Sequence, residues 1–110
     1  MAGAPDVDLE PRRVDELHRQ GSVELVDVRE PYEWEAGRVS GARHVELAEL
    51  SALAPERPVV FYCRVGARSA MAAVAFRRAG YEAYSMAGGL EAWQADGLPL
   101  DPPDGEVALH

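Results

Sequence analysis

The residues best suited to covalent chemistry are the single cysteine and the short segment that follows it. Cys63 ends an unbroken run of apolar and aromatic residues that starts at Val59, and the next residues are Arg64, Val65, Gly66, Ala67 and Arg68. Such a run predicts a central parallel strand that is covered on both faces. From Ser69 the sequence is rich in alanine, which predicts a helix. This order of strand, short loop and helix places the sulfur among backbone N–H groups at a helix N-terminus, where an anion is stabilised.

This setting favours the thiolate form of Cys63, which is the nucleophilic form. A free cysteine has a pKa of about 8.5, and helix N-termini with nearby cations lower it to roughly 3.5–7.5. Arg64 and Arg68 supply such cations and offer planar donors to an oxyanion, but neither can act as a base. We therefore expect the thiolate to attack a soft electrophile with a good leaving group, such as a sulfur atom carried on sulfite. The product would be a persulfide on Cys63, formed without a cofactor.

Each of these residues also has a structural explanation. A lone cysteine is more often an inert core residue, and the two arginines could be solvated charges or ion-pair partners. The position of Cys63 at the end of a buried strand, followed by Gly66 and a helix, favours the reactive interpretation.

The elements that must position this loop alternate along the chain. We expect strands at residues 23–28, 43–45, 59–63 and 82–85, with helices that begin at Pro11, Pro31, Leu47 and Ser69 and after Gly88-Gly89. Strands separated by helices predict right-handed crossovers and a parallel sheet with helices on both faces, an α/β fold. Ligands of such sheets bind beyond the carboxyl ends of the strands, where Cys63 and Asp27 both stand.

Length and composition limit the possible classes of protein. A chain of 110 residues forms one domain, which we place at 9–98, after a lead-in at 1–8 and before a tail at 99–110 that is loose or lies over the surface. One cysteine and three scattered histidines predict neither a disulfide nor a metal site. No leader pattern and no apolar run of about 18 residues is present, so we expect a cytoplasmic protein.

The charge of the chain argues against polyanionic partners. The net charge is −8, from 19 acidic residues against 11 arginines and no lysine. Such a surface repels nucleic acid and anionic membranes, so we expect neither as a partner. It also repels small anionic substrates at long range, so their capture has to depend on the local field of the Cys63 loop.

Three ordered motifs carry a resemblance to a known family. They are Cys63–Ser69, read as Cys-x-x-x-x-Arg-Ser; Val26–Pro31 running on to Gly37–Val45; and Ala87–Trp93, with its Gly-Gly pair. Together they span Leu9 to about Leu98, and the sequence resembles the rhodanese family of thiosulfate and related sulfurtransferases.

The resemblance implies a single rhodanese-like domain with a five-stranded parallel sheet flanked by helices. It implies sulfur transfer from thiosulfate or a persulfide donor to a thiol, to cyanide or to a thiol-bearing protein, with Cys63 as nucleophile and residues 64–69 as the substrate loop. It also implies that Asp27 and Arg29 lie beside the pocket, although helix capping and a structural ion pair are the first explanation for both. Arg38 and Glu46 depart from the family pattern, which often has histidine and proline there.

Two alternatives to sulfur transfer remain. One is a rhodanese-like module that binds or regulates a protein and whose cysteine is inert. The other is a phosphatase or arsenate reductase of the same fold. Those relatives have five residues between cysteine and arginine, whereas residues 64–67 make four here, which favours the smaller sulfur site.

Overall fold

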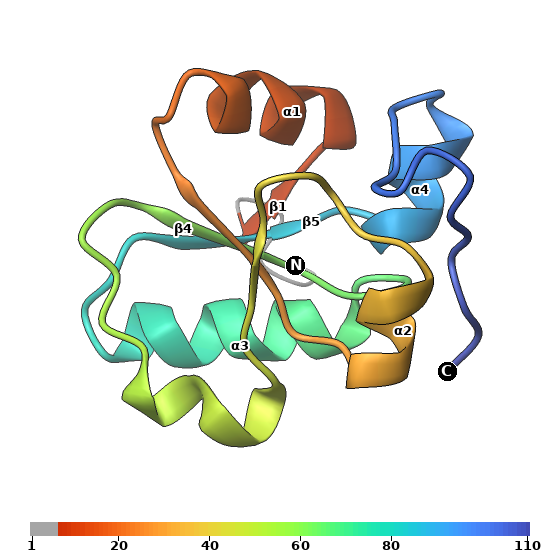
Figure 1. Ribbon diagram of the computed structural model, residues 1–110. Coiled ribbons are helices and arrows are strands. Elements are labelled where there is room, and N and C mark those ends of the chain that lie inside the picture. Colours follow the sequence, from red (N-terminus) through yellow and green to blue (C-terminus); the bar gives the residue numbers. More distant parts are fainter. Residues whose placement is uncertain (1–6) are drawn as a thin grey trace.

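The fold is a five-stranded, wholly parallel sheet, seen in a computed structural model that describes residues 7–110. The strands lie in the order β1-β5-β4-β2-β3, so β4 is central. Each crossover between parallel strands contains helical residues, which gives the α/β arrangement of Figure 1. The strands are β1 (Asp8–Leu9), β2 (Glu24–Asp27), β3 (Arg43–His44), β4 (Val59–Tyr62) and β5 (Ala83–Met86). This sheet confirms the predicted fold class.

Helices cover both faces of the sheet (Figure 1). The short 3-10 helix η2 (Leu47–Ala52) and α3 (Ala67–Arg78) cover one face, and α1 (Pro11–Arg19) and α4 (Gly89–Ala95) cover the other. The six-residue helix α2 (Pro31–Ala36) follows β2 and lies beside the loop between β4 and α3. No helix within residues 7–110 is both long and apolar enough to span a membrane.

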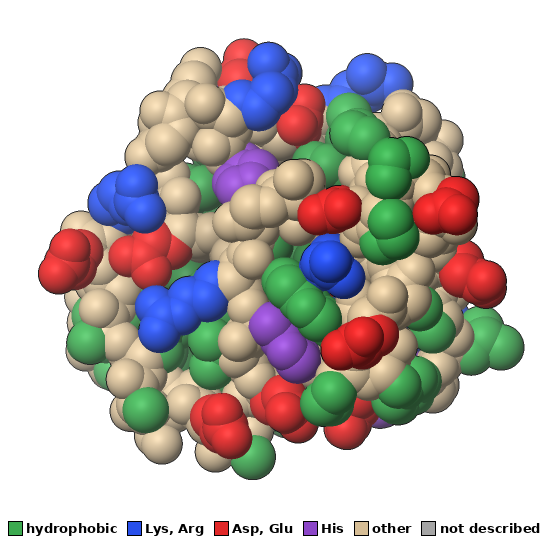
Figure 2. All heavy atoms as spheres, in the orientation of Figure 1, with side chains coloured by type: hydrophobic (Ala, Val, Ile, Leu, Met, Phe, Trp, Pro, Cys, Tyr) green, Lys and Arg blue, Asp and Glu red, His purple; other side chains and the backbone are tan. Residues whose placement is uncertain are grey.

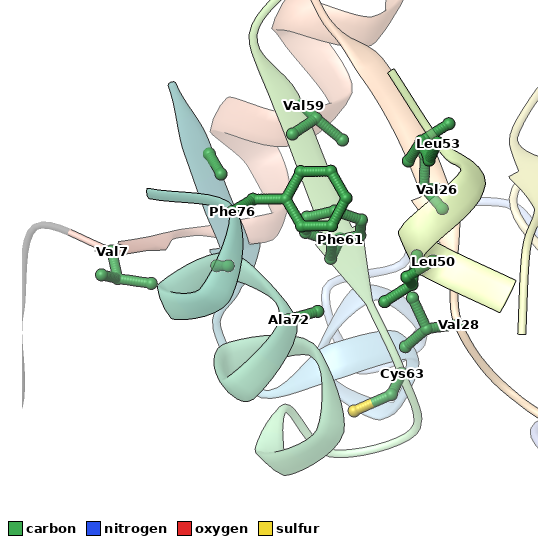
Figure 3. Close-up of a cluster of buried hydrophobic side chains, with 12 residues drawn as sticks. Val7, Val26, Val28, Leu50, Leu53, Val59, Phe61, Cys63, Ala72 and Phe76 are labelled. Carbon is green, nitrogen blue, oxygen red and sulfur yellow. The ribbon is translucent and has the colours of Figure 1, made fainter. Parts of the chain in front are cut away.

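Alternation along β4 divides the core into two clusters. All four of its residues are buried. Val59 and Phe61 point toward α3 and η2, whereas Val60 and Tyr62 point toward α1 and α4. Because side chains alternate along a strand, Cys63 continues the first set and lies under α3 with Phe61 (Figure 3). The cysteine is therefore held by packing on the α3 side of the sheet.

The fifth strand, β1, is the element that sequence patterning did not place. Leu9 pairs with Met86 of β5, and its carbonyl accepts the Ala87 N–H. A strand of two residues has no alternation to detect, so only the family resemblance implied a fifth strand. The remaining elements lie within a few residues of their predicted positions.

The C-terminal segment lies along the domain surface beside α4 and α2 (Figure 1). Asp101 forms an antiparallel bridge with Arg38, and the Glu106 N–H donates to the Ala36 carbonyl at 2.9 Å. Leu100 is buried against the α1 and α4 side of the core. Residues 99–110 therefore pack against the domain that they follow in sequence.

Candidate active site

Cys63 is the residue around which the candidate site is built. It directly follows β4, and its side chain points toward the first turn of α3 (Figure 3). The residue is only 1% exposed. The loop at residues 64–66 and the start of α3 enclose the sulfur, so its chemistry depends on what those residues present to it.

Polar groups of the loop and of the first turn of α3 contact the sulfur directly. The Gly66 N–H donates to Sγ at 3.1 Å, and the Ser69 Oγ lies 3.5 Å from Sγ. Gly66 caps α3 with a φ of 109°, in the left-handed region that favours glycine, and this turn aims its N–H back at the sulfur. The predicted arrangement of strand, loop and helix N-terminus therefore exists as a set of donors around one sulfur atom.

These donors favour the thiolate. Burial raises the pKa of the Cys63 thiol, but hydrogen bonds from the Ser69 hydroxyl and from the backbone N–H groups of Ser69 and Gly66, together with the charge of Arg68, outweigh it. The net pKa lies below the ordinary value of a cysteine. Hydrogen bonding to a charged form stabilises that form, so the loop acts on Cys63 as an anion site.

Arg68 is held by a carboxylate from another helix. Its Nη1 and Nη2 donate to Oε1 and Oε2 of Glu33 at 2.9 and 3.0 Å, a bidentate pair. Glu33 is fully buried in α2, where it also accepts the Glu30 N–H at 2.9 Å. Arg68 thus ties the start of α3 to α2 and adds positive charge near the sulfur.

Arg64 lies on the opposite side of the loop. Its guanidinium forms an ion pair with Glu91 of α4, and its buried Nε has no hydrogen-bond partner among residues 7–110. Val65 is 46% exposed at the tip of the loop, and Ala67 is exposed as well. The loop therefore presents an apolar outer surface over a polar, cationic base.

Gly88 and Gly89 bring the start of α4 against the backbone of the Cys63 loop. The N–H groups of Leu90 and Glu91 donate to the carbonyls of Cys63 and Arg64 at 2.8 and 3.1 Å. A Cβ on Gly89 would lie 2.4 Å from the Arg64 carbonyl oxygen and 2.5 Å from that of Cys63. This approach explains the glycine at position 89.

Asp27 and Arg29 form a pair that is fully buried. The Arg29 guanidinium donates to both Asp27 carboxylate oxygens and to the Gly37 carbonyl, the latter at 2.7 Å. It also lies over the Tyr62 ring, 5.7 Å from the centroid. These contacts join β2, α2 and β4 and match the structural explanation. A role of either residue beside the pocket stays a prediction.

Two residues of the site were not foreseen. Glu33 could be identified from sequence only as the third residue of a capping box that starts at Glu30. Ser85 of β5 lies 2.8 Å from the Ser69 hydroxyl and carries no sequence signal at all. Within residues 7–110 no group of three or more His, Cys, Asp or Glu side chains is placed to hold a metal ion.

A comparison with known families identifies the domain. The model of the rhodanese-like domain matches residues 10–96, which includes the sheet from β2 onward and the whole Cys63 loop. The chain belongs to the rhodanese-like domain family. The predicted resemblance is therefore confirmed.

Two relatives of similar sequence are a described sulfurtransferase and an uncharacterized protein. The chain is 34% identical over 104 residues to the thiosulfate sulfurtransferase GlpE of Pseudomonas aeruginosa, covering 90% of this chain and 93% of that protein. It is 39% identical over 75 residues to the uncharacterized protein YqhL of Bacillus subtilis, covering 64% of this chain but only 60% of that relative.

A solved structure extends the comparison to a different suggested activity. A protein of unknown function from Rhodopseudomonas palustris, described as a possible tyrosine phosphatase, superposes with a TM-score of 0.75 at 30% identity, covering 84% of this chain and 83% of the other. The rhodanese-like fold is thus shared by relatives with sulfurtransferase and phosphatase descriptions.

Proposed function

We propose that this protein is a sulfurtransferase that moves a sulfane sulfur through a persulfide on Cys63. The single observation that carries this proposal is the set of donors around Sγ: the Gly66 N–H at 3.1 Å and the Ser69 hydroxyl at 3.5 Å at the start of α3. They stabilise a thiolate without a neighbouring base. The similarity to a thiosulfate sulfurtransferase over 90% of the chain supports the same reaction class.

In the first step the Cys63 thiolate attacks the outer sulfur of thiosulfate. A Sγ–S bond forms, the S–S bond of thiosulfate breaks, and sulfite leaves with the electron pair. No proton has to be removed from the nucleophile, which suits a site whose nearby cationic groups are arginines. A persulfide donor would react in the same way, with its thiolate as the leaving group.

In the second step an acceptor thiolate or cyanide attacks the outer sulfur of the persulfide. The Sγ–S bond breaks and its electron pair returns to Cys63, so the thiolate is regenerated and no redox cofactor is needed. The donors that stabilise the resting thiolate also stabilise it as the leaving group. The reaction would therefore be ping-pong, with the persulfide as the covalent intermediate.

The same chemistry bears on partners and compartment. The donor would be a small sulfur anion such as thiosulfate, and the acceptor a small thiol, cyanide or a thiol-bearing protein. The net charge of −8 disfavours nucleic acid and anionic membranes. A reacting thiol has to stay reduced, so we propose the reducing cytoplasm as the compartment.

The decisive experiment is intact-protein mass spectrometry after incubation with thiosulfate and desalting. We expect a gain of one sulfur atom that a reductant removes. Cys63→Ser is the matched control, since a hydroxyl is nearly isosteric but a poor nucleophile for sulfur, and this variant should gain no mass and lose all turnover. Thiosulfate turnover retained by Cys63→Ser would reject the assignment.

The alternatives predict different outcomes. The similarity to a possible tyrosine phosphatase favours testing an aryl phosphate in parallel. Hydrolysis of that phosphate, with no sulfur gained from thiosulfate or a persulfide donor, would support the phosphatase. A Cys63 thiol that also resists alkylation at neutral pH would instead support a binding module, an outcome to which the 1% exposure of Cys63 lends weight.

A further inference from the structure

Two serine hydroxyls form a buried polar chain beneath the Cys63 sulfur. Ser69 in the first turn of α3 and Ser85 in β5 are 0% and 1% exposed, and their Oγ atoms lie 2.8 Å apart. The Ser69 Oγ lies 3.5 Å from the Cys63 Sγ and 3.2 Å from the Gly66 carbonyl oxygen. This chain of hydroxyl groups thus runs from β5 to the Cys63 sulfur.

The register of the sheet explains how Ser85 reaches this place. Ser85 pairs with Phe61 on β4, and Cys63 lies two residues further along the same strand direction. Ala83 packs in the cluster that contains Phe61 and Cys63, and by alternation the Ser85 side chain points to the same face. The first turn of α3 covers this spot, so Ser69 lies between Ser85 and the sulfur.

Counting hydroxyl protons shows which serine donates in the hydrogen bond between Ser69 and Ser85. Each hydroxyl has one proton, and Ser69 is the hydrogen-bond partner of the Ser85 hydroxyl within residues 7–110. A buried hydroxyl proton left without an acceptor is costly, so Ser85 donates to Ser69. Ser69 then keeps its own proton for an acceptor on its other side, where its hydroxyl can donate to the Gly66 carbonyl at 3.2 Å or to Cys63 Sγ at 3.5 Å. The Gly66 carbonyl already accepts the Ala70 N–H at 3.0 Å, and an ionised sulfur is a stronger acceptor than a neutral carbonyl, so the thiolate form of Cys63 competes for the Ser69 proton.

We propose that Ser85 is a positioning residue for Cys63: its hydroxyl donates to Ser69 and thereby keeps the Ser69 proton available to the Cys63 thiolate. A hydroxyl that accepts a hydrogen bond becomes a stronger donor, so the contact also strengthens the bond to a thiolate. The inference rests on the proposed function only in taking the thiolate as the reacting form.

Charged groups around the sulfur also affect its titration and have to stay constant in the test. On the loop and on the packed elements α2, α3, α4 and β2 these groups are Arg64, Arg68, Glu33, Glu91, Asp27 and Arg29. Serine variants leave all of them in place, so a change in thiol titration reports the hydroxyl chain.

The test is a pH titration of the Cys63 thiol in Ser69→Ala, Ser85→Ala and the double variant. Thiolate absorbance in the ultraviolet follows the buried sulfur without a reagent, and the pH dependence of iodoacetamide labelling gives a second readout. We expect the midpoint to rise by about 1 pH unit in Ser69→Ala and about 0.5 in Ser85→Ala. The double variant should match Ser69→Ala, because Ser85 acts through Ser69.

Controls separate this role from a structural one. Tyr84→Phe removes a hydroxyl from the opposite face of β5 and should leave the midpoint unchanged. Threonine and valine have the same shape, but only threonine keeps a hydroxyl, so Ser85→Val should shift the midpoint of the thiol titration and Ser85→Thr should not. This pair tests the role of the hydroxyl even if Ser85→Ala folds poorly.

Either of two results would overturn the role of Ser85. One is an unchanged midpoint in both Ser85→Ala and Ser85→Val, and the other is shifts of Ser69→Ala and Ser85→Ala that add in the double variant. The titration needs no sulfur donor, so it tests the hydroxyl chain independently of sulfur transfer. If the midpoints shift as expected but no persulfide forms, the proposed function is rejected and the role of Ser85 stands.

Discussion

At the scale of single residues, burial and hydrogen bonding have opposite effects on the pKa of the Cys63 thiol. Burial alone would keep the Cys63 thiol neutral, and the donors of Gly66 and Ser69 with the charge of Arg68 reverse that preference. Arg68 acts here while both of its terminal nitrogens are engaged by Glu33. It therefore supplies charge to the site from a fixed position.

Replacing Arg68 should affect both the thiol and the fold. Arg68→Ala removes a nearby cation, so we expect the pKa of the Cys63 thiol to rise by about 0.5 to 1 unit, measured by the pH dependence of alkylation. It also leaves the buried Glu33 carboxylate unpaired, which should lower the free energy of unfolding by about 3 kcal/mol. Donor binding should weaken as well.

A double variant separates these two effects. Arg68→Ala combined with Glu33→Gln removes the unpaired charge, so most of the lost stability should return in urea unfolding while the raised thiol pKa persists. An alkylation profile that returns to that of the unchanged protein in the double variant would contradict a direct effect of the Arg68 charge.

Glu33 itself should make stability sensitive to acid. Burial raises the pKa of Glu33, but hydrogen bonds from Arg68 and the Glu30 backbone, with the charges of Arg68 and Arg29, outweigh it and hold the pKa below its ordinary value. A lowered folded pKa stabilises the fold above the unfolded value, about 4.3, and that contribution is lost as pH falls through the folded pKa.

The acid dependence can be measured by urea unfolding between about pH 6 and pH 3. We expect the free energy of unfolding to fall less steeply in Glu33→Gln than in the unchanged protein, because glutamine does not titrate. Equal slopes in the two proteins would show that other carboxylates account for the acid sensitivity.

At the scale of elements, the start of α4 supports the Cys63 loop from behind. The backbone carbonyls of Cys63 and Arg64 accept hydrogen bonds from the first turn of α4, and Gly89 has to be a glycine for the two backbones to come this close. The Cys63 loop is therefore shaped by the backbone of a helix whose side chains lie outside the donor set around the sulfur.

Gly89→Ala should displace the loop. Its Cβ would lie 2.4 Å from a backbone oxygen, and at a φ of +64° alanine is strained in any case. We expect a loss of more than about 2 kcal/mol in urea unfolding and altered thiol reactivity. Gly97→Ala is the matched control: at a φ of +80° it meets nothing within 4 Å, so only the conformational cost of about 1 kcal/mol applies. Equal losses would contradict the close contact.

At the scale of the whole molecule, the surface charge opposes the proposed anionic donor. Figure 2 shows Asp and Glu side chains spread over one face with Arg side chains between them. With a net charge of −8, a thiosulfate ion meets repulsion at long range before it reaches the cations of the loop.

Salt should therefore accelerate the first half-reaction. Raising ionic strength from about 0.02 to 0.2 M screens the global repulsion, and we expect the second-order rate of persulfide formation from thiosulfate to increase about two- to fivefold. Stopped-flow or quenched mass measurements follow this step. Alkylation by neutral iodoacetamide is the control and should change little. A rate with thiosulfate that falls with salt would show that the cations of the loop dominate capture.

The sequence alone determined the fold class and the family, and it predicted Cys63 and its loop as the candidate site. These features are local: Cys63, the Gly66 turn and Ser69 lie within seven consecutive residues, where a strand and a helix constrain each other directly. The pattern of apolar residues and the positions of proline and glycine likewise predicted most helices and strands. Among the strands within residues 7–110, β1 was not predicted, because its two residues carry no periodicity and follow no strand-like run.

Tertiary structure alone decided which distant groups support the sulfur. Glu33 meets Arg68 across 35 residues, Ser85 meets Ser69 across 16, and Gly89 meets the carbonyls of the loop from the next helix. None of these contacts follows from spacing along the chain, because each depends on strand register and on where a crossover returns to the sheet. Those are set by the packing of the whole core.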